Sequence, residues 1–225
     1  MVSTGSPTGR PTGRSTGPSA GPSTGPARIL LIRHAESTWN AVGRIQGWAN
    51  APLSEAGRSQ SRRLARQLAA AGVAVREVVS SDLLRAAETA AIVGRALGCP
   101  APTSDARWRE REIGWWTGLT NAELAELHPE LVARWRARQV GPPGGESDES
   151  LLARSHAALA AAGQRAGRHP EGVVLVVSHG ALISLMERDA GAGPGGFPNL
   201  GGTWVDWSEE GPSFSGRLEL SEAEL

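Results

Sequence analysis

Lysine is absent from the 225 residues of this chain, so all 23 basic residues are arginines. The 23 acidic residues balance them, which removes any overall electrostatic attraction to nucleic acid or to an anionic membrane. An anion site must therefore be built from arginine, histidine or backbone N–H groups. We accordingly predict no nucleic-acid partner and no membrane partner.

Cysteine and long apolar runs are also scarce. Cys99 is the only cysteine, which excludes an intrachain disulfide and a cysteine-based zinc site. No apolar run approaches the roughly 20 residues that a membrane-spanning helix needs. The first residues lack the apolar segment of a signal peptide, and no cluster of magnesium or zinc ligands stands out. We therefore expect a cytoplasmic protein without a metal or another cofactor.

The first 26 residues differ in composition from the rest. Residues 7–26 repeat four-residue units of proline, glycine, serine and threonine, with almost no apolar side chain. Such a segment cannot offset the entropy lost on ordering. We predict a disordered low-complexity tail over 1–26 and a single domain over 27–225, because no second break in composition follows.

Strand patterns alternate with helix patterns throughout this domain. Continuous apolar runs are typical of strands buried on both faces, and alternating helices indicate crossover connections within a mainly parallel sheet. We predict an α/β fold, a three-layer αβα sandwich. The strands are expected at 28–33, 75–81, 173–178, 203–208 and 216–221, and the helices at 54–72, 83–98, 121–127, 130–139 and 149–167.

Basic side chains follow three of these strands. Arg33 and His34 follow the first, Arg85 lies shortly after the second, and His179 and Gly180 follow the third. Ligands of open α/β sheets bind beyond the carboxyl ends of the strands, so these groups should meet. Arginine offers paired donors and a helix start offers free N–H groups, and both suit phosphate. The sequence therefore predicts a phosphate pocket.

Four segments, LIRHAESTWN, SSDLLRAAETA, WREREIGWWTG and VVSHG, resemble in order and spacing the motifs of the histidine phosphatase superfamily, in its phosphoglycerate mutase-like branch. The resemblance covers nearly all of the predicted domain. One departure is Ala35, which stands where the family's Arg-His-Gly signature has glycine. The resemblance implies a phosphoglycerate mutase-like sheet and a phosphohistidine intermediate.

The resemblance implies that His34 is the nucleophile that accepts the phosphoryl group. A neutral imidazole suits this role, since its ordinary pKa of about 6.5 leaves it largely unprotonated at neutral pH. Phosphoryl transfer depends mainly on charge stabilisation, which Arg33, Arg85 and a protonated His179 would supply. Arg33 should also discourage protonation of His34.

The same resemblance assigns the remaining roles. Glu110 holds the position of the family's general acid, and Gly114 matches the glycine that follows it. Glu112 is the competing choice. Asn40, Arg44, Gln46 and the backbone N–H of Gly180 are predicted to bind the substrate. Glu146 and Ser147 are interpreted as capping residues of the helix that follows them.

The resemblance predicts a histidine acid phosphatase-type phosphomonoesterase. The segment 110–179 is short and lacks the basic, proline-rich insertion of cofactor-dependent mutases, which favours hydrolysis. FPNLGGTWVDW, residues 197–207, resembles the C-terminal segment of actinobacterial glucosyl-3-phosphoglycerate phosphatases and suggests a sugar phosphate or glycerate-like metabolite. The alternatives are mutase-type phosphoryl transfer, an inactive phosphate-binding protein and a zinc hydrolase. Whether the protein forms a homodimer is left open.

Overall fold

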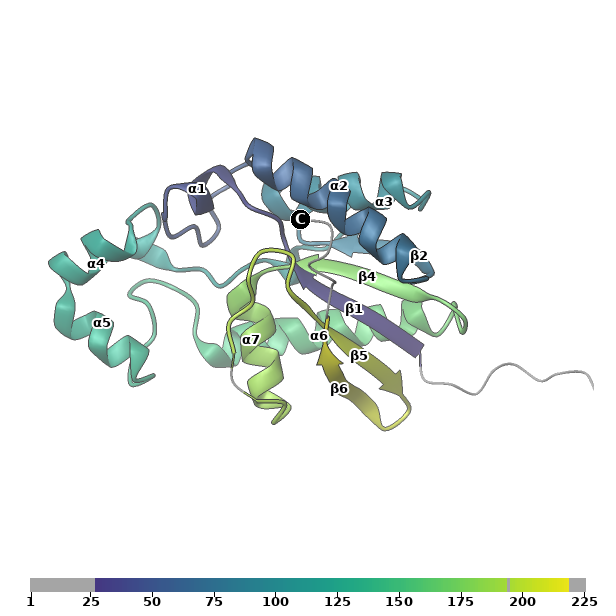
Figure 1. Cartoon of the computed structure of the whole chain (residues 1–225). Helices are drawn as coiled ribbons and strands as arrows, with labels where there is room; N and C mark the ends of the chain where they lie inside the picture. Colours follow the sequence, from purple (N-terminus) through teal and green to yellow (C-terminus); the bar gives the residue numbers. More distant parts are fainter. Residues whose placement is uncertain (1–26, 194, 219–225) are drawn as a thin grey trace, which may run out of the picture.

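The computed structural model describes residues 27–193 and 195–218, and the predicted tail lies outside them. Its centre is a six-stranded sheet in the order β3-β2-β4-β1-β5-β6 (Figure 1). Within these residues the strands are β1 (Ala27–Arg33), β2 (Val75–Ser80), β3 (Thr103–Ser104), β4 (Val173–Ser178), β5 (Gly202–Ser208) and β6 (Gly211–Arg217).

The sheet is parallel where the predicted site lies. β1 and β2 both pair in parallel with β4, and β3 pairs in parallel with β2. β5 and β6 are antiparallel additions at one edge. The mainly parallel sheet is thus confirmed. Because β2, β4 and β1 are neighbouring parallel strands, their carboxyl ends lie side by side at the same end of the sheet.

Two helices cover each face of this sheet, as the predicted three-layer arrangement requires. α2 and α3 pack on one face, and α6 and α7 pack on the other (Figure 1). The helices are α1 (Thr38–Ala41), α2 (Glu55–Ala70), α3 (Leu84–Ala96), α4 (Asn121–Leu127), α5 (Pro129–Arg136), α6 (Asp148–Ala166) and α7 (Gly180–Asp189), with 3-10 turns η1 (Ala106–Trp108) and η2 (Gly114–Trp116). None of the helices in 27–193 and 195–218 is long and apolar enough to cross a bilayer.

The register of β1 divides the hydrophobic core in two. Ile29 and Leu31 pack with α6 and α7, whereas Leu30 and Ile32 belong to the core under α2 and α3. Successive side chains of a strand point to opposite faces, so a strand covered on both faces must be apolar at every position. This explains the continuous apolar runs in β1 and β4.

Three helices end at a glycine in the left-handed conformation, which has little steric cost without a Cβ. Gly72, Gly98 and Gly191 follow α2, α3 and α7 with φ of 70°, 70° and 71°. The corresponding residue after α5 is Arg138, with φ of 61°. The ends of α2, α3 and α7 thus have the usual glycine at this position, whereas the end of α5 has an arginine.

The predicted position of the final strand is wrong. β6 covers Gly211–Arg217, upstream of the predicted 216–221, of which 219–221 lie outside the described residues. Gly211 and Pro212 resemble a turn in the sequence, but they pair with β5. Proline is tolerated there because β6 is an edge strand with one side unpaired in the described sheet.

Residues 105–147, which we call the excursion, lie between β3 and α6. They include α4 and α5, which stand beside the sheet rather than on it (Figure 1). A small core of their own holds them, built from Ile113, Trp116, Leu124 and Val132. The excursion carries the predicted general acid.

Candidate active site

The three predicted strand-end motifs meet at one edge of the sheet. The His34 N–H donates to the Ser178 carbonyl at 3.0 Å, and the Ser81 N–H donates to the Val177 carbonyl at 3.0 Å. A cavity of about 290 Å³ opens there. Of the predicted site residues, it is lined by Arg33, His34, Asn40, Arg44, Gln46, Arg85 and Glu110.

His34 is held as a neutral imidazole with its proton on Nδ1 and its lone pair on Nε2. Its Nδ1 lies 2.6 Å from the Ala35 carbonyl, which can only accept, so Nδ1 carries the proton. Nε2 then accepts from Arg85 Nε at 3.1 Å. Burial and the charges of Arg85 and Arg33 lower the pKa of His34 well below 6.5. The imidazole is therefore neutral at neutral pH.

Alanine fits at position 35 without strain. Among the described residues, the non-glycine residues with positive φ are Arg138 and Leu200, so Ala35 does not need the left-handed conformation that favours glycine. Its side chain is fully buried, and its N–H donates to Thr89 Oγ1 at 3.1 Å. The departure from the family signature therefore leaves the local backbone intact.

Two arginines provide positive charge beside the nucleophile. Arg85 is 1% exposed, and its guanidinium donates to the carbonyls of Ala49 at 2.8 Å and Gly47 at 2.9 Å. Burial lowers its pKa to about 10, so it stays charged at neutral pH. Arg33 donates to the Phe197 carbonyl at 2.6 Å, and burial likewise lowers its pKa. These fixed cations suit a phosphate dianion.

The protonated His179 expected from the sequence is corrected by the structure. Burial, followed by the charges of Arg85 and of nearby His34 and Arg33, lowers the pKa of His179 well below 6.5. Its ring centroid lies 5.1 Å from that of His34. Both ring nitrogens are buried without a hydrogen-bond partner among the described residues. Such groups are rare because they are costly, and they mark a place where a neutral N–H could meet an anion.

The Glu110 carboxylate sits between this cavity and the start of α7. Its oxygens accept the N–H groups of Ala181 and Leu182 at 3.3 Å each, and Oε1 accepts that of Arg111 at 2.8 Å. Its charge raises the pKa of Arg33, opposing burial. Two of the α7 N–H groups expected to be free are therefore occupied by the candidate acid.

Glu112 has a different environment. Its Oε1 accepts the N–H groups of Ile113 and Gly114, both at 3.0 Å, which closes a local turn. It is not among the residues that line the cavity, whereas Glu110 is. The geometry therefore favours Glu110 in the choice that the sequence left open.

Sequence reasoning missed Arg154, which organises the backbone around Glu110. Its guanidinium donates to the carbonyls of Arg107 at 2.8 Å, Arg109 at 2.6 Å and Glu110 at 2.8 Å. It also forms a two-point ion pair with Glu146, at 2.8 and 2.7 Å. An arginine within a helical pattern gives no signal of this role, because its partners are backbone carbonyls.

The predicted capping pair divides into two roles. The Ser147 hydroxyl caps α6 by accepting the Ser150 N–H at 3.1 Å, as expected. Glu146 instead holds Arg154. Burial would raise the pKa of Glu146, but hydrogen bonds from Arg154 and Ser150 outweigh it, so the pKa is lowered. The carboxylate therefore remains ionised and its pair with Arg154 intact at neutral pH.

The predicted substrate-binding side chains are arranged around a short hydrogen-bonded loop. The Ser37 N–H donates to Asn40 Oδ1 at 3.1 Å, and the Ser37 hydroxyl lies 2.8 Å from Gln46 Oε1. This orients the amide of Asn40 so that its Nδ2 is the group left to donate. Arg44 donates to the carbonyl of Gly118, which ties the loop to the excursion.

Two residues act behind the cavity wall. Gly180 is not among the lining residues, and a Cβ there would lie 3.3 Å from Arg33 Cδ, so this glycine leaves room for Arg33. Asn199, which the sequence did not single out, donates to the His34 carbonyl at 3.0 Å. No group of three or more metal-binding side chains occurs within 27–193 and 195–218.

Known proteins resemble this chain in sequence and in fold. Phosphoglycerate mutase-like protein 4 of Arabidopsis thaliana is 38% identical over 167 residues, 72% of this chain and 70% of that protein. The metal-independent phosphoserine phosphatase of the same plant is 39% identical over 161 residues, 70% of this chain and 66% of that protein. The solved mycobacterial glucosyl-3-phosphoglycerate phosphatase complexed with VO3 has a TM-score of 0.74 and 29% identity, covering 87% of this chain and all of that one. Residues 29–215 match the family model of the histidine phosphatase superfamily (branch 1), and the chain belongs to that superfamily.

Proposed function

We propose that this protein is a phosphomonoesterase that needs no metal and hydrolyses a small phosphorylated metabolite through a phosphohistidine. The observation that carries the proposal is the neutral His34, which lines the cavity and whose Nε2 accepts a hydrogen bond from the buried, charged Arg85. The phosphatase names of two relatives support hydrolysis. A reducing cytoplasm is the proposed location, in keeping with a single free cysteine.

In the first step Arg85 gives up its hydrogen bond to His34 Nε2, the freed Nε2 lone pair attacks phosphorus, and the ester P–O bond breaks on the opposite side. Arg33 and Arg85 stabilise the negative oxygens of the transferring group. Glu110, in its protonated form, gives its proton to the departing oxygen. The products are a phosphohistidine, an alcohol and the Glu110 carboxylate.

The second step reverses the role of Glu110. Its carboxylate takes a proton from water as the water oxygen attacks phosphorus and the P–N bond breaks. Inorganic phosphate leaves, and His34 is again neutral. Neutral His179 carries one N–H that can donate to the phosphoryl oxygens, and a bound dianion would also oppose the charges that now lower its pKa.

The proposal is tested by measuring phosphate release from a panel of phosphorylated metabolites in the presence of EDTA. Phosphoenzyme is trapped by a denaturing quench at alkaline pH, where phosphohistidine survives. We expect turnover in EDTA and trapped phosphate in the natural chain, with both abolished by His34→Ala. His128→Ala, which changes an exposed histidine with no proposed role, should behave like the natural chain.

Loss of turnover in EDTA with recovery in a divalent ion would contradict the metal-independent route. Trapped phosphate persisting in His34→Ala would contradict the assignment of the nucleophile.

A further inference from the structure

A second cavity of about 550 Å³ adjoins the catalytic one. Arg111, Trp135 and Ala181 line both, so the two cavities share a wall. The second cavity is enclosed by the end of α5 and the residues after it, by the start of α6 and by one side of α7. The two cavities are therefore adjacent.

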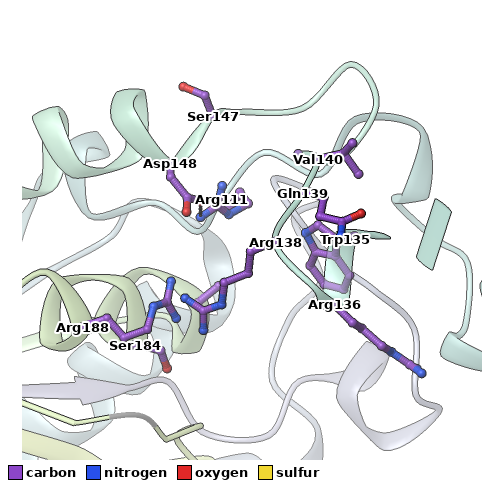
Figure 2. A pocket seen from close by; sticks show the side chains of 12 residues that line it. Arg111, Trp135, Arg136, Arg138, Gln139, Val140, Ser147, Asp148, Ser184 and Arg188 are labelled. Atoms are coloured by element: carbon purple, nitrogen blue, oxygen red, sulfur yellow. Dashed lines mark ion pairs between the residues drawn. The ribbon is translucent and has the colours of Figure 1, made fainter. Parts of the chain in front are cut away.

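Unbalanced positive charge distinguishes this cavity. Arg111 pairs with Asp148 at 2.5 Å, and Figure 2 shows the guanidinium groups of Arg138 and Arg188 turned toward one another beside that pair. Among the described residues, neither Arg138 nor Arg188 has an ion-pair or hydrogen-bond partner for its side chain. Burial, then repulsion by Arg138, lowers the pKa of Arg188. Four arginines, Arg111, Arg136, Arg138 and Arg188, thus line the cavity together with one carboxylate, that of Asp148.

The backbone at Arg138 gives independent support. Its φ of 61° is the left-handed value that follows α5, where α2, α3 and α7 each have glycine. A non-glycine residue is strained there, and strain of this kind gathers at functional sites. The chain therefore keeps an arginine side chain at a position where glycine would be the easier choice.

We propose that the second cavity binds an anionic group of the substrate itself, a carboxylate or a second phosphate, at the end distal to the scissile phosphate. Arg138 and Arg188 supply the paired N–H donors that such a group prefers. Trp135, half-buried between the cavities, would contact the part of the molecule that connects the two charges. This inference rests on the proposed phosphatase activity and narrows its substrates to phosphomonoesters with two separated charges.

The test uses matched pairs of alkyl phosphates that end in either a carboxylate or a hydroxyl at the same chain length. We expect kcat/KM to favour the carboxylate by about tenfold at the length that spans the two cavities, as charge-assisted pairing implies. The preference should shrink as ionic strength rises, because these arginines are partly exposed. p-Nitrophenyl phosphate, which has no distal charge, serves as the reference for the reaction itself.

Arg138→Gly is the decisive variant, because it relieves the strained backbone while removing the cation. We expect its melting temperature to rise. The ratio of kcat/KM for the carboxylate substrate to that for the hydroxyl substrate should fall toward one, and turnover of p-nitrophenyl phosphate should be unchanged. Arg188→Gln should likewise lose the preference. Arg134→Gln, an exposed arginine of α5 outside both cavities, is the control and should keep it.

Three results would overturn the inference. The first is an equal kcat/KM for the carboxylate and hydroxyl substrates at every chain length. The second is a carboxylate preference that survives when Arg138→Gly and Arg188→Gln are combined. The third is a faster hydrolysis of the hydroxyl substrate when free acetate or phosphate is added, which would indicate a separate effector. Failure of the proposed function looks different, since p-nitrophenyl phosphate would then not be hydrolysed either.

Discussion

The two sides of the catalytic cavity are held in different ways. On the phosphate side, His34 and His179 follow directly from paired strands, and Arg85 stands in the first turn of α3. On the leaving-group side, Glu110 belongs to the excursion, and the side chain of Arg154 holds its backbone. The first side depends on the backbone of the sheet, and the second on hydrogen bonds from side chains, since Arg154 and Trp48 both donate to the Glu110 carbonyl.

This difference matches the chemistry that each side performs. The phosphoryl group is the same in every substrate, so fixed and buried groups suit it; His34, Arg85 and His179 are 2%, 1% and 0% exposed. The alcohol differs between substrates, and it meets a segment with its own small core. We infer that specificity can change in the excursion without disturbing the phosphate side.

The largest effect that separates the two sides is expected for Glu110→Gln, which keeps the shape of the side chain but removes its proton. An alkyl leaving group needs that proton, and general acid help is worth about 10²–10⁴-fold. p-Nitrophenolate leaves with a pKa of about 7 and hardly needs it. Single-turnover cleavage of both ester types should therefore show a large loss only for the alkyl ester, provided that ester cleavage limits both.

Equal losses on the two esters would remove Glu110 as the acid, and Glu112→Gln would then be measured in the same way. His34→Ala is the reference variant for the phosphate side, since it should lose activity on both esters alike.

A smaller effect is expected for Arg154→Met, which removes the guanidinium that positions the Glu110 backbone. Misplacing a catalytic group by about 1 Å can cost up to about 10²-fold in rate, so we expect a loss of about 10- to 100-fold on alkyl esters. The loss on aryl esters should be smaller, as for Glu110→Gln. A merely destabilised fold would reduce both rates together.

Arg165→Met is the matched control, because Arg165 lies on the same helix and pairs with Glu77 away from the site. It should lower the melting temperature without changing the ratio of alkyl to aryl rates. The same change of ratio in Arg165→Met would argue against a positioning role for Arg154.

The smallest expected effect is the pH dependence of stability that comes from the phosphate side. The pKa values of His34 and His179 are lowered in the folded chain, while the unfolded chain keeps about 6.5. Below that pH the unfolded state binds more protons, so the free energy of unfolding falls as pH falls. The slope is up to about 1.4 kcal/mol per pH unit for each histidine, and it vanishes above about pH 7.5.

Urea unfolding between pH 7.5 and 5.5 measures this slope. His34→Gln should reduce it, whereas His128→Gln, which changes an exposed histidine, should change it little. An unchanged slope in His34→Gln would show that the buried histidine takes up its proton as readily in the folded state as in the unfolded one.

The sequence predicted the phosphate side better than the leaving-group side. Arg33, His34, Arg85 and His179 follow apolar strand patterns, so a pattern that predicts strands also predicts where their ends meet. Arg154 could not be found in this way, since backbone carbonyls of a folded segment are its partners. The charge of His179 was wrong because it depends on burial, which the motif does not reveal.

The predicted position of β6 was wrong for a related reason. A glycine and a proline in sequence favour a turn, and only the neighbouring β5 makes Gly211 and Pro212 part of a strand. Helix boundaries were more predictable, because their signals are local. Ser54 caps α2 by accepting the Gly57 N–H at 2.9 Å, and Gly72 follows its end, as expected.

The register of β1 has a consequence for how this chain can change in evolution. Its alternate residues belong to the two separate cores, and its last residue precedes the nucleophile. A single inserted or deleted residue in β1 would exchange every side chain between the two cores and move His34 away from Arg85. The excursion has no such constraint on its length. Natural length variants of this protein should therefore differ within 105–147 and keep the distance in sequence from Ala27 to His34 constant.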